Sequence, residues 1–141
     1  MFYKYEIKEE SGKFIGFVED LDLETQPLDT MEEAKETLIK GLSGFIELQY
    51  RRQKLPVPLP STKVSEGDSF LYVPIKLQLR ILLWNTMLEK RYRQADLAKM
   101  LGVSRAQAQM YVNGSSGVSV ESYEKALKLM GVYPSVSLAE R

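Results

Sequence analysis

QADLAKMLGVSRAQAQMYVN, residues 94–113, decides the fold of the C-terminal half of this chain. Two short helices that cross at a tight turn need a small residue at the crossing, where Ala98 stands, and Gly102 accepts the turn four positions later. Ser104 predicts an N-cap for the second helix, and Asn113-Gly114 predicts its end. A helix-turn-helix is therefore favoured over an ordinary helical hairpin. Apolar residues stand where the two helices bury a shared face: Leu97, Leu101, Val103, Ala108 and Tyr111.

A helix-turn-helix places its second helix in the major groove of DNA, with the early residues of that helix against base edges. Arg105 is suited to a bidentate pair with guanine, and Gln107 or Gln109 to a pair with adenine. Ala106 and Met110 are suited to thymine methyl groups. The predicted DNA-binding residues are Arg93, Gln94, Ser104, Arg105, Ala106, Gln107, Gln109, Met110 and Asn113.

Contacts that do not depend on base sequence are predicted at the first helix of the motif. Gln94 opens that helix, where its side chain and the nearby N–H groups meet a phosphate. Lys90, Arg91 and Arg93 supply attraction to the DNA backbone, although a solvated helix end explains them equally well. Because one motif reads only a few base pairs, we expect a homodimer or higher homo-oligomer on a two-fold site in double-stranded operator DNA.

Composition limits the chemistry that this chain can perform. Its 141 residues suit one domain or two small ones. The absence of cysteine and histidine removes disulfides, cysteine-ligated zinc and the commonest general base. We expect no cofactor and no metal. The N-terminus does not read as a signal peptide, and no apolar run approaches the roughly 18 residues of a membrane span. A cytoplasmic location without membrane contact is expected.

The net charge of zero conceals two halves of opposite sign. Residues 1–60 carry a charge of −4, whereas residues 74–141 carry +5. This division indicates two different partners, with chance unevenness in a small protein as the alternative.

The front half is expected to hold a small antiparallel sheet. Alternating residues predict a strand around Tyr3–Ile7, and a turn at Ser11-Gly12 leads to a second strand at Lys13–Val18. A weaker strand is expected at Leu23–Leu28, where Pro27 indicates an edge or the end of a strand. Ser69–Val73 is expected to be the last strand of this half.

Between these strands, Thr30 and Glu33 fit a capping box that opens a helix running to about Arg52. Gly41 and Gly44 lower the helix propensity, and we expect a close approach of this helix to the sheet in compensation. The prolines that follow predict a stiff, extended spacer along the domain edge, in preference to a ligand for a proline-reading module. An apolar stripe at helical spacing comprises Ala34, Leu38, Leu42, Phe45 and Ile46.

The back half is expected to be helical throughout. Pro74 suits the first turn of a helix from Ile75 to about Lys90, which is apolar on most of its circumference. Such a helix packs the helix-turn-helix on one side and either the front domain or a twin subunit on the other. Ser119 caps a further helix, Val120–Met130, before Gly131. The tail Val132–Leu138 is either a strand or frayed.

The predicted class is α+β: a small antiparallel sheet with one or two helices, followed by an all-α helix-turn-helix domain. The first domain spans residues 1–73, with a proline-containing extended segment at 55–68. The second spans residues 74–141 and is expected to bind DNA and to dimerise.

Two family resemblances follow from these motifs. Residues 74–133 resemble the lambda-repressor (Xre-like) type of helix-turn-helix domain through QADLAKMLGVS, VNG and LKLMGV. In the front half, YKYEI, FIGFVEDLDL and LDTMEEAKETLIKGLSGFIE resemble the domain of HicB antitoxins, followed in the expected order by a PLP segment and the helix-turn-helix. The chain departs from the HicB pattern at Glu19-Asp20, where a proline-aspartate pair is common.

The HicB resemblance implies an inactive, truncated RNase H-like domain that covers a small, basic, RNA-cleaving HicA-type toxin. It also implies repression of the chain's own operon. Independently of the family, an acidic surface suits a partner that binds RNA through positive charge. For each of the five acids named next, the alternative is a charged loop residue that faces water and binds no partner. The candidate toxin-binding residues are Glu19, Asp20, Asp22, Glu24 and Glu32.

Two other functions compete with the antitoxin. A metal-dependent nuclease needs convergent carboxylates, but the run at 19–22 lies in a loop and the strand Phe14–Val18 contains no acid. We therefore expect this chain to have no enzymatic activity. A free-standing transcriptional repressor with a ligand-sensing front domain is the second alternative, although the front half has no phosphate loop or pocket signature.

Overall fold

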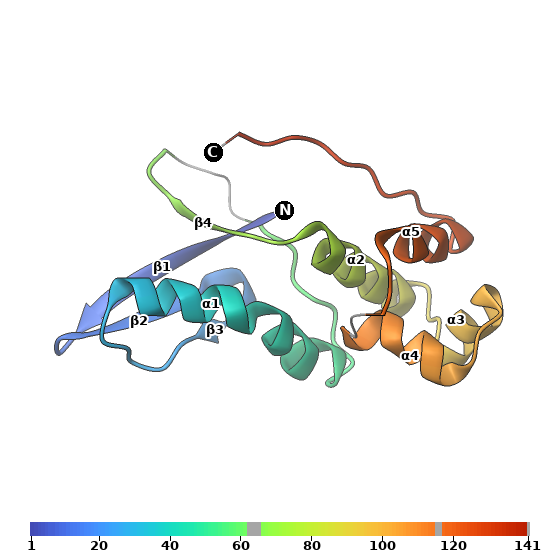
Figure 1. Ribbon diagram of the computed structural model, residues 1–141, viewed down its shortest axis with the longest axis horizontal. Coiled ribbons are helices and arrows are strands. Elements are labelled where there is room, and N and C mark those ends of the chain that lie inside the picture. Colours follow the sequence, from blue (N-terminus) through green and yellow to red (C-terminus); the bar gives the residue numbers. More distant parts are fainter. Residues whose placement is uncertain (62–65, 115–116, 141) are drawn as a thin grey trace. The chain divides into compact units, whose positions relative to one another are not determined.

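The computed structural model describes residues 1–61, 66–114 and 117–140. The chain divides into two compact units, Met1–Pro74 and Ile75–Arg141, called here the N-terminal and C-terminal units. The first contains a four-stranded antiparallel sheet and a long helix, and the second is helical (Figure 1). The predicted α+β class, with the sheet first, is confirmed.

Tight-turn geometry sets the register of the sheet. Ser11 and Gly12 both have positive φ, of 51° and 77°, which is the backbone of a two-residue primed hairpin turn. The turn pairs Glu10 with Lys13 and therefore Glu6 with Phe17. The predicted hairpin and last strand are confirmed. The strands lie in the order β3-β2-β1-β4, with bounds Phe2–Glu10 (β1), Lys13–Val18 (β2), Leu23–Glu24 (β3) and Ser69–Tyr72 (β4).

The third strand is shorter than the sequence predicts. β3 ends at Glu24, and only an isolated bridge between Phe14 and Leu28 rejoins the sheet. The hydroxyl of Thr25 accepts a hydrogen bond from the Gly16 N–H at 2.9 Å, so a side chain replaces part of the backbone ladder. Pro27 has no N–H to donate where the ladder would continue. The prediction of one strand over Leu23–Leu28 is therefore wrong in its length.

Helix α1 spans Met31–Ile46 and begins at the predicted cap. The Thr30 hydroxyl accepts from the Glu33 N–H at 3.1 Å. The return bond is displaced by one residue from a regular capping box, because the Glu33 carboxylate accepts from the Asp29 N–H at 3.3 Å. The predicted stripe is buried at Ala34, Leu38, Leu42 and Ile46, and Phe45 is half-buried.

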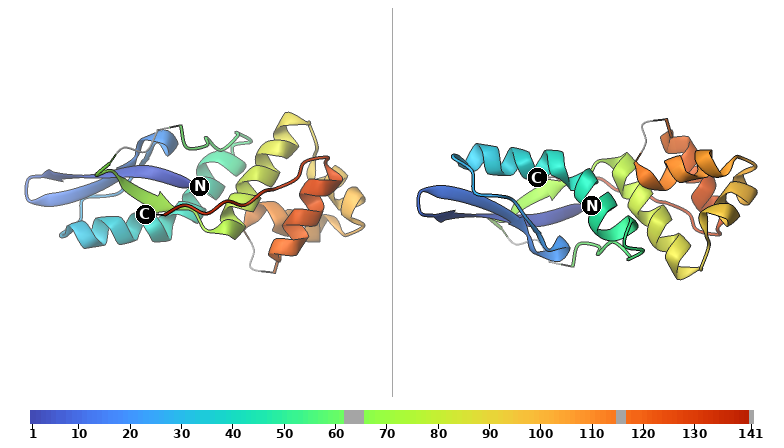
Figure 2. Two further views of the ribbon diagram at one scale, coloured as in Figure 1. Left: turned by 90° about the horizontal axis from the view of Figure 1, so that it is seen from above. Right: turned by 90° about the horizontal axis from the view of Figure 1, so that it is seen from below.

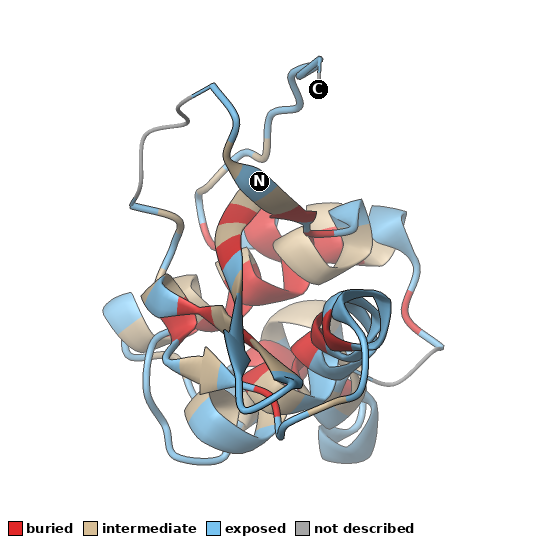
Figure 3. Cartoon of the chain, turned by 90° about the vertical axis from the view of Figure 1, so that its left-hand side faces the viewer, coloured by how far each residue is buried: buried red, intermediate tan, exposed pale blue. Residues whose placement is uncertain are grey.

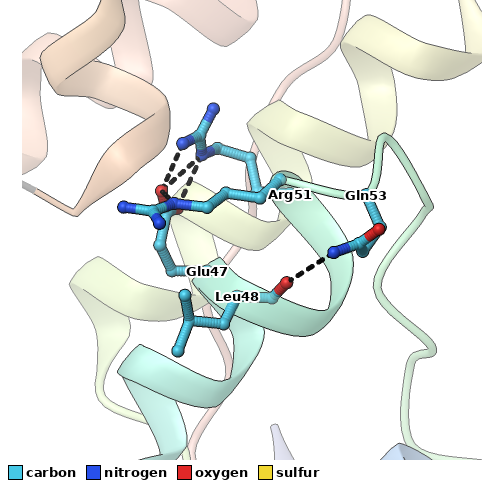
Figure 4. A network of polar contacts seen from close by, with 5 residues as sticks. Glu47, Leu48, Arg51 and Gln53 are labelled. Atoms are coloured by element: carbon cyan, nitrogen blue, oxygen red, sulfur yellow. Dashed lines mark hydrogen bonds and ion pairs between the residues drawn. The ribbon is translucent and has the colours of Figure 1, made fainter.

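One π-helical turn, η2 (Glu47–Arg51), continues α1 almost to the predicted end. Figure 4 shows how this turn is held: the Arg51 guanidinium donates through Nε to the Glu47 carboxylate at 2.6 and 2.7 Å, and Arg52 lies 3.7 Å from it. The Tyr50 hydroxyl donates to the Leu21 carbonyl at 2.6 Å. The end of the helix is thereby tied to the loop after β2.

Close approach of helix and sheet occurs at a glycine other than the two predicted. A Cβ placed on Gly16 of β2 would lie 2.9 Å from Leu38 Cδ1 and 3.4 Å from the Ala34 carbonyl oxygen. A Cβ on Gly41 or Gly44 would meet no atom of the described chain within 4 Å. Both helix glycines are exposed. The expectation that they approach the sheet is wrong, because the close contact lies nearer the start of α1, where that helix crosses β2.

The extended segment after η2 packs on the N-terminal unit. Val57 is 2 % exposed, and the Tyr3 hydroxyl donates to the Pro58 carbonyl at 2.6 Å. Burial raises the pKa of Tyr3 far above its usual value, and the nearby Asp20 carboxylate raises it further, so the hydroxyl remains a donor. These contacts agree with the predicted spacer. Residues 62–65 of the predicted 55–68 segment lie outside the described residues.

In the C-terminal unit, Ser119 caps α5 by accepting from the Ser122 N–H at 3.1 Å. α2 contacts both α4 and α5. The tail Val132–Leu138, all of which is described, forms no strand. None of the described helices is long and apolar enough to cross a membrane. The helices are α2 (Ile75–Glu89), α3 (Gln94–Leu101), α4 (Arg105–Asn113) and α5 (Val120–Leu129). Figure 3 colours the described residues of the chain by how far each is buried.

Gly16→Ala should destabilise the chain by about 1–3 kcal/mol, because the new methyl group overlaps the buried Leu38 side chain. Gly41→Ala is the matched control and should stabilise it by about 0.5–1 kcal/mol, because that glycine is exposed within α1. Urea unfolding followed by far-UV circular dichroism measures both. Equal effects of the two substitutions would contradict the assigned contact.

Candidate functional site

The helix-turn-helix is present where the sequence predicts it. Gly102 ends α3 in the left-handed region with φ of 68°, and the Val103 N–H donates to the Ala98 carbonyl at 3.0 Å. The crossing of α3 and α4 is lined by Leu97, Ala98, Ala108 and Val112, each at most 5 % exposed. Of the other predicted core residues, Leu101, Val103 and Tyr111 are half-buried.

A full capping box opens α4. The Ser104 hydroxyl accepts from the Gln107 N–H at 3.1 Å, and the Gln107 amide oxygen accepts from the Ser104 N–H at 3.3 Å. The box satisfies backbone donors at the point where the helix would enter the major groove. It also engages one of the two glutamines predicted to read adenine.

The far end of α4 rests on a buried arginine. Gly114 caps the helix with φ of 85°, and a Cβ there would lie 1.8 Å from Nη1 of Arg80. Arg80 comes from α2 and is 5 % exposed. A cation near the carboxyl end of a helix is favoured by the helix dipole. The arginine therefore supports α4 from inside the unit.

Two tyrosines fasten α4 to α5. The rings of Tyr111 and Tyr123 meet edge to face at 5.8 Å, and the Tyr123 hydroxyl donates to the Tyr111 carbonyl at 2.8 Å. Burial raises the pKa of Tyr123 to about 12, with a smaller opposing effect from the positive charge of Arg80. The hydroxyl thus keeps its proton, and with it the hydrogen bond.

The predicted DNA-binding residues lie on the outside of this framework. Six of them are exposed and the other three are half-buried. None belongs to the buried core of the described residues. The exposed residues are Arg93, Ser104, Arg105, Ala106, Gln107 and Gln109, and the half-buried ones are Gln94, Met110 and Asn113.

The two glutamines predicted to read adenine differ because only one of them takes part in the helix cap. A bidentate pair with adenine needs both the oxygen and the nitrogen of the amide. The oxygen of Gln107 already accepts from the backbone of Ser104. The exposed side chain of Gln109 makes no hydrogen bond with any other described residue. Gln109 is therefore better suited than Gln107 to read adenine.

Three of the predicted toxin-binding acids lie together in the N-terminal unit. Glu19, Asp22 and Glu24 line a groove of about 540 Å³. The 3-10 turn η1 (Glu19–Leu21) and the left-handed Asp22, with φ of 52°, bring them there by reversing the chain between β2 and β3. Thr25 then returns the chain to the sheet.

The remaining two predicted acids are placed differently. Asp20 lies beside the groove, but its carboxylate accepts from Ser61, at 3.2 Å from the N–H and 2.6 Å from the hydroxyl. Glu32 is exposed in the first turn of α1, which packs on the opposite face of the sheet (Figure 2). Neither residue lines the groove.

The groove also contains residues that the sequence interpretation missed. Glu6 and Glu10 of β1 line it, together with Ile15 and Phe17 of β2. The period-two alternation of β1 and the two-residue turn were the signals that could have placed them. No group of three or more His, Cys, Asp or Glu side chains in the described residues is arranged to hold a metal ion.

Comparisons with known proteins agree with both units. A helix-turn-helix family model matches residues 86–136. Antitoxin HicB 2 of Photorhabdus laumondii is 32 % identical over 107 residues, which cover 73 % of this chain and 71 % of that protein. Antitoxin HicB of Pseudomonas fluorescens is 29 % identical over 92 % of this chain and 88 % of its own length.

The chain belongs to the HicB antitoxin family. Antitoxin HicB of Escherichia coli K12 is similar over 86 % of both chains, at 25 % identity. The matches to these HicB proteins cover most of this chain and so extend beyond the helix-turn-helix. This HicB-family chain is thus an antitoxin relative with a DNA-binding domain of the helix-turn-helix type.

Gly114→Ala should destabilise the C-terminal unit more than Gly102→Ala. Both substitutions place a side chain at positive φ, which costs about 1–3 kcal/mol. Only the methyl group at 114 also collides with the buried Arg80, since a Cβ at 102 meets no described atom within 4 Å. Thermal unfolding followed by the fluorescence of Trp84, the only tryptophan, reports on this unit. The contact is refuted if both variants lose the same stability.

Proposed function

We propose that the chain is a cytoplasmic antitoxin that neutralises a small RNA-cleaving HicA-type toxin through its N-terminal unit. Its C-terminal unit represses the chain's own operon by binding operator DNA. The observation that carries this proposal is a formed helix-turn-helix in a chain related to HicB antitoxins over most of its length. Catalysis has no part in the proposal.

The proposed DNA binding is supported by the separation of buried core residues from exposed residues in the C-terminal unit. Core side chains such as Leu97 and Ala108 hold α3 and α4 together, and they leave the early residues of α4 exposed. We assign Arg105 to a guanine and Gln109 to an adenine, with Ala106 and Met110 near thymine methyl groups. A homodimer would supply two such helices to a two-fold operator.

Contacts to the DNA backbone are assigned to the start of α3. Gln94 is the first residue of that helix and Arg93 is its exposed N-cap residue. The Arg93 N–H donates to the Asp96 carboxylate at 2.7 Å, which fixes the backbone there and leaves the guanidinium for a phosphate.

Arg105→Ala should weaken binding to operator DNA by about 1–3 kcal/mol and leave binding to scrambled DNA nearly unchanged. Arg93→Ala should weaken binding to both DNAs alike, because it removes a phosphate contact. It should also lower the slope of log K against log salt concentration by about one. Fluorescence anisotropy at several salt concentrations measures both effects. Equal losses on both DNAs for the two variants would reject the assigned roles.

The toxin half is tested by co-purification and by titration. A tagged chain should recover a small basic protein encoded beside it, and adding that protein should change operator affinity in a gel-shift assay. The change is expected because two ligands of one dimer are thermodynamically linked when each alters the access of the other. Recovery of the homo-oligomer alone would favour the free-standing repressor, and constant affinity at every toxin ratio would exclude the linkage.

A further inference from the structure

The face of the sheet opposite α1 carries a row of three residues across adjacent strands. Phe17 of β2 pairs with Glu6 on β1 and with Glu24 on β3. Directly paired residues of antiparallel strands point to the same face, with Cβ atoms roughly 4.5–5.5 Å apart. The row therefore places an aromatic ring between two carboxylates. All three residues line the groove of about 540 Å³.

Charge in this groove is strongly one-sided. Its lining includes five carboxylates and a single ammonium group, that of Lys8. None of these carboxylates makes an ion pair with another residue among 1–61, 66–114 and 117–140. The groove thus lacks the cations that would balance it. The five acids are Glu6, Glu10, Glu19, Asp22 and Glu24.

The floor of the groove is apolar and partly open to water. Ile15 and Phe17 are half-buried, although they lie in a strand of a sheet whose other face is packed against α1. An apolar centre with a polar rim is the usual anatomy of a protein–protein interface. The ring of Phe17 already attracts one cation, because Lys8 Nζ lies 4.6 Å from its centroid.

We propose that this groove is the docking surface for the basic toxin, and that a lysine or arginine of the toxin lies over Phe17 between Glu6 and Glu24. The inference rests on the proposed antitoxin function and specifies its surface. Two carboxylates satisfy the donors of a guanidinium or ammonium group, and the ring contacts its face. A cationic protein surface fits the five acids better than a metal ion, because no three acids of the described residues converge on one point.

Two double substitutions of equal charge change test this surface. Glu6→Gln with Glu24→Gln removes both carboxylates of the row. Glu9→Gln with Glu36→Gln is the control, because Glu9 is exposed on β1 next to the alternating positions of the groove and Glu36 is exposed on α1. Neither control residue lines the groove. Titration calorimetry with the small basic protein recovered by co-purification, in a catalytically inactivated form, gives the affinities.

The groove variant should bind this toxin at least about tenfold more weakly, with a smaller salt dependence, and the control should stay within about twofold of the unchanged chain. Equal affinity of both double variants overturns the docking surface and leaves the antitoxin proposal intact. If the unchanged chain itself does not bind the toxin, the antitoxin proposal fails and the docking surface fails with it.

A second measurement covers the case in which the groove variant does not fold. Amide chemical shifts of the unchanged full chain, recorded with and without toxin, should move along β1, β2 and β3 around Phe17. Shifts confined to the exposed side of α1 would overturn the proposal. Phe17→Leu keeps an apolar floor without a ring, and it should weaken binding less than removal of both carboxylates.

Discussion

Helix α1 can lie against β2 because Gly16 presents no side chain to Leu38 and Ala34. That contact buries one face of the sheet, including Tyr3 and Val18, neither of which is exposed at all. A single helix covers a single face, and period-two alternation sends every second strand residue to the other. The residues on the uncovered face are therefore selected for water or for a partner. They include both paired carboxylates of the Phe17 row.

The C-terminal unit separates its core from its outer surface in the same way. Arg80 and Tyr123 hold α4 from inside, one at the end of the helix and one on a backbone carbonyl. Because these contacts use the inner side and the backbone of α4, the side chains of Arg105 and Gln109 are not needed to hold the helix in place. Arg105 and Gln109 thus remain available for base edges, whereas Gln107 gives its amide oxygen to the cap. The first turn of α4 must therefore supply both the side chains that cap the helix and the side chains that contact bases.

Local rules made much of this architecture predictable. The helix-turn-helix followed from residue size at Ala98 and Gly102, and the β1–β2 register followed from a two-residue turn. Sequence patterns failed where distant segments meet. Gly41 and Gly16 are equally permissive in sequence, and only the packing shows which one is crowded. Asp20 has a partner 41 residues away in Ser61. No local spacing encodes that hydrogen bond.

The proposed toxin-binding and DNA-binding surfaces lie in units that are joined by a short stretch of chain. Val73 and Pro74 alone separate β4 from α2, and the buried Val73 donates its N–H to the Met1 carbonyl at 3.1 Å. Pro74 has a fixed φ and no N–H of its own. A toxin at the proposed surface would thus be joined through a short, stiff connection to the proposed DNA-binding unit. Because binding linkage is reciprocal, any change that toxin makes in operator affinity is matched by an equal change that operator makes in toxin affinity.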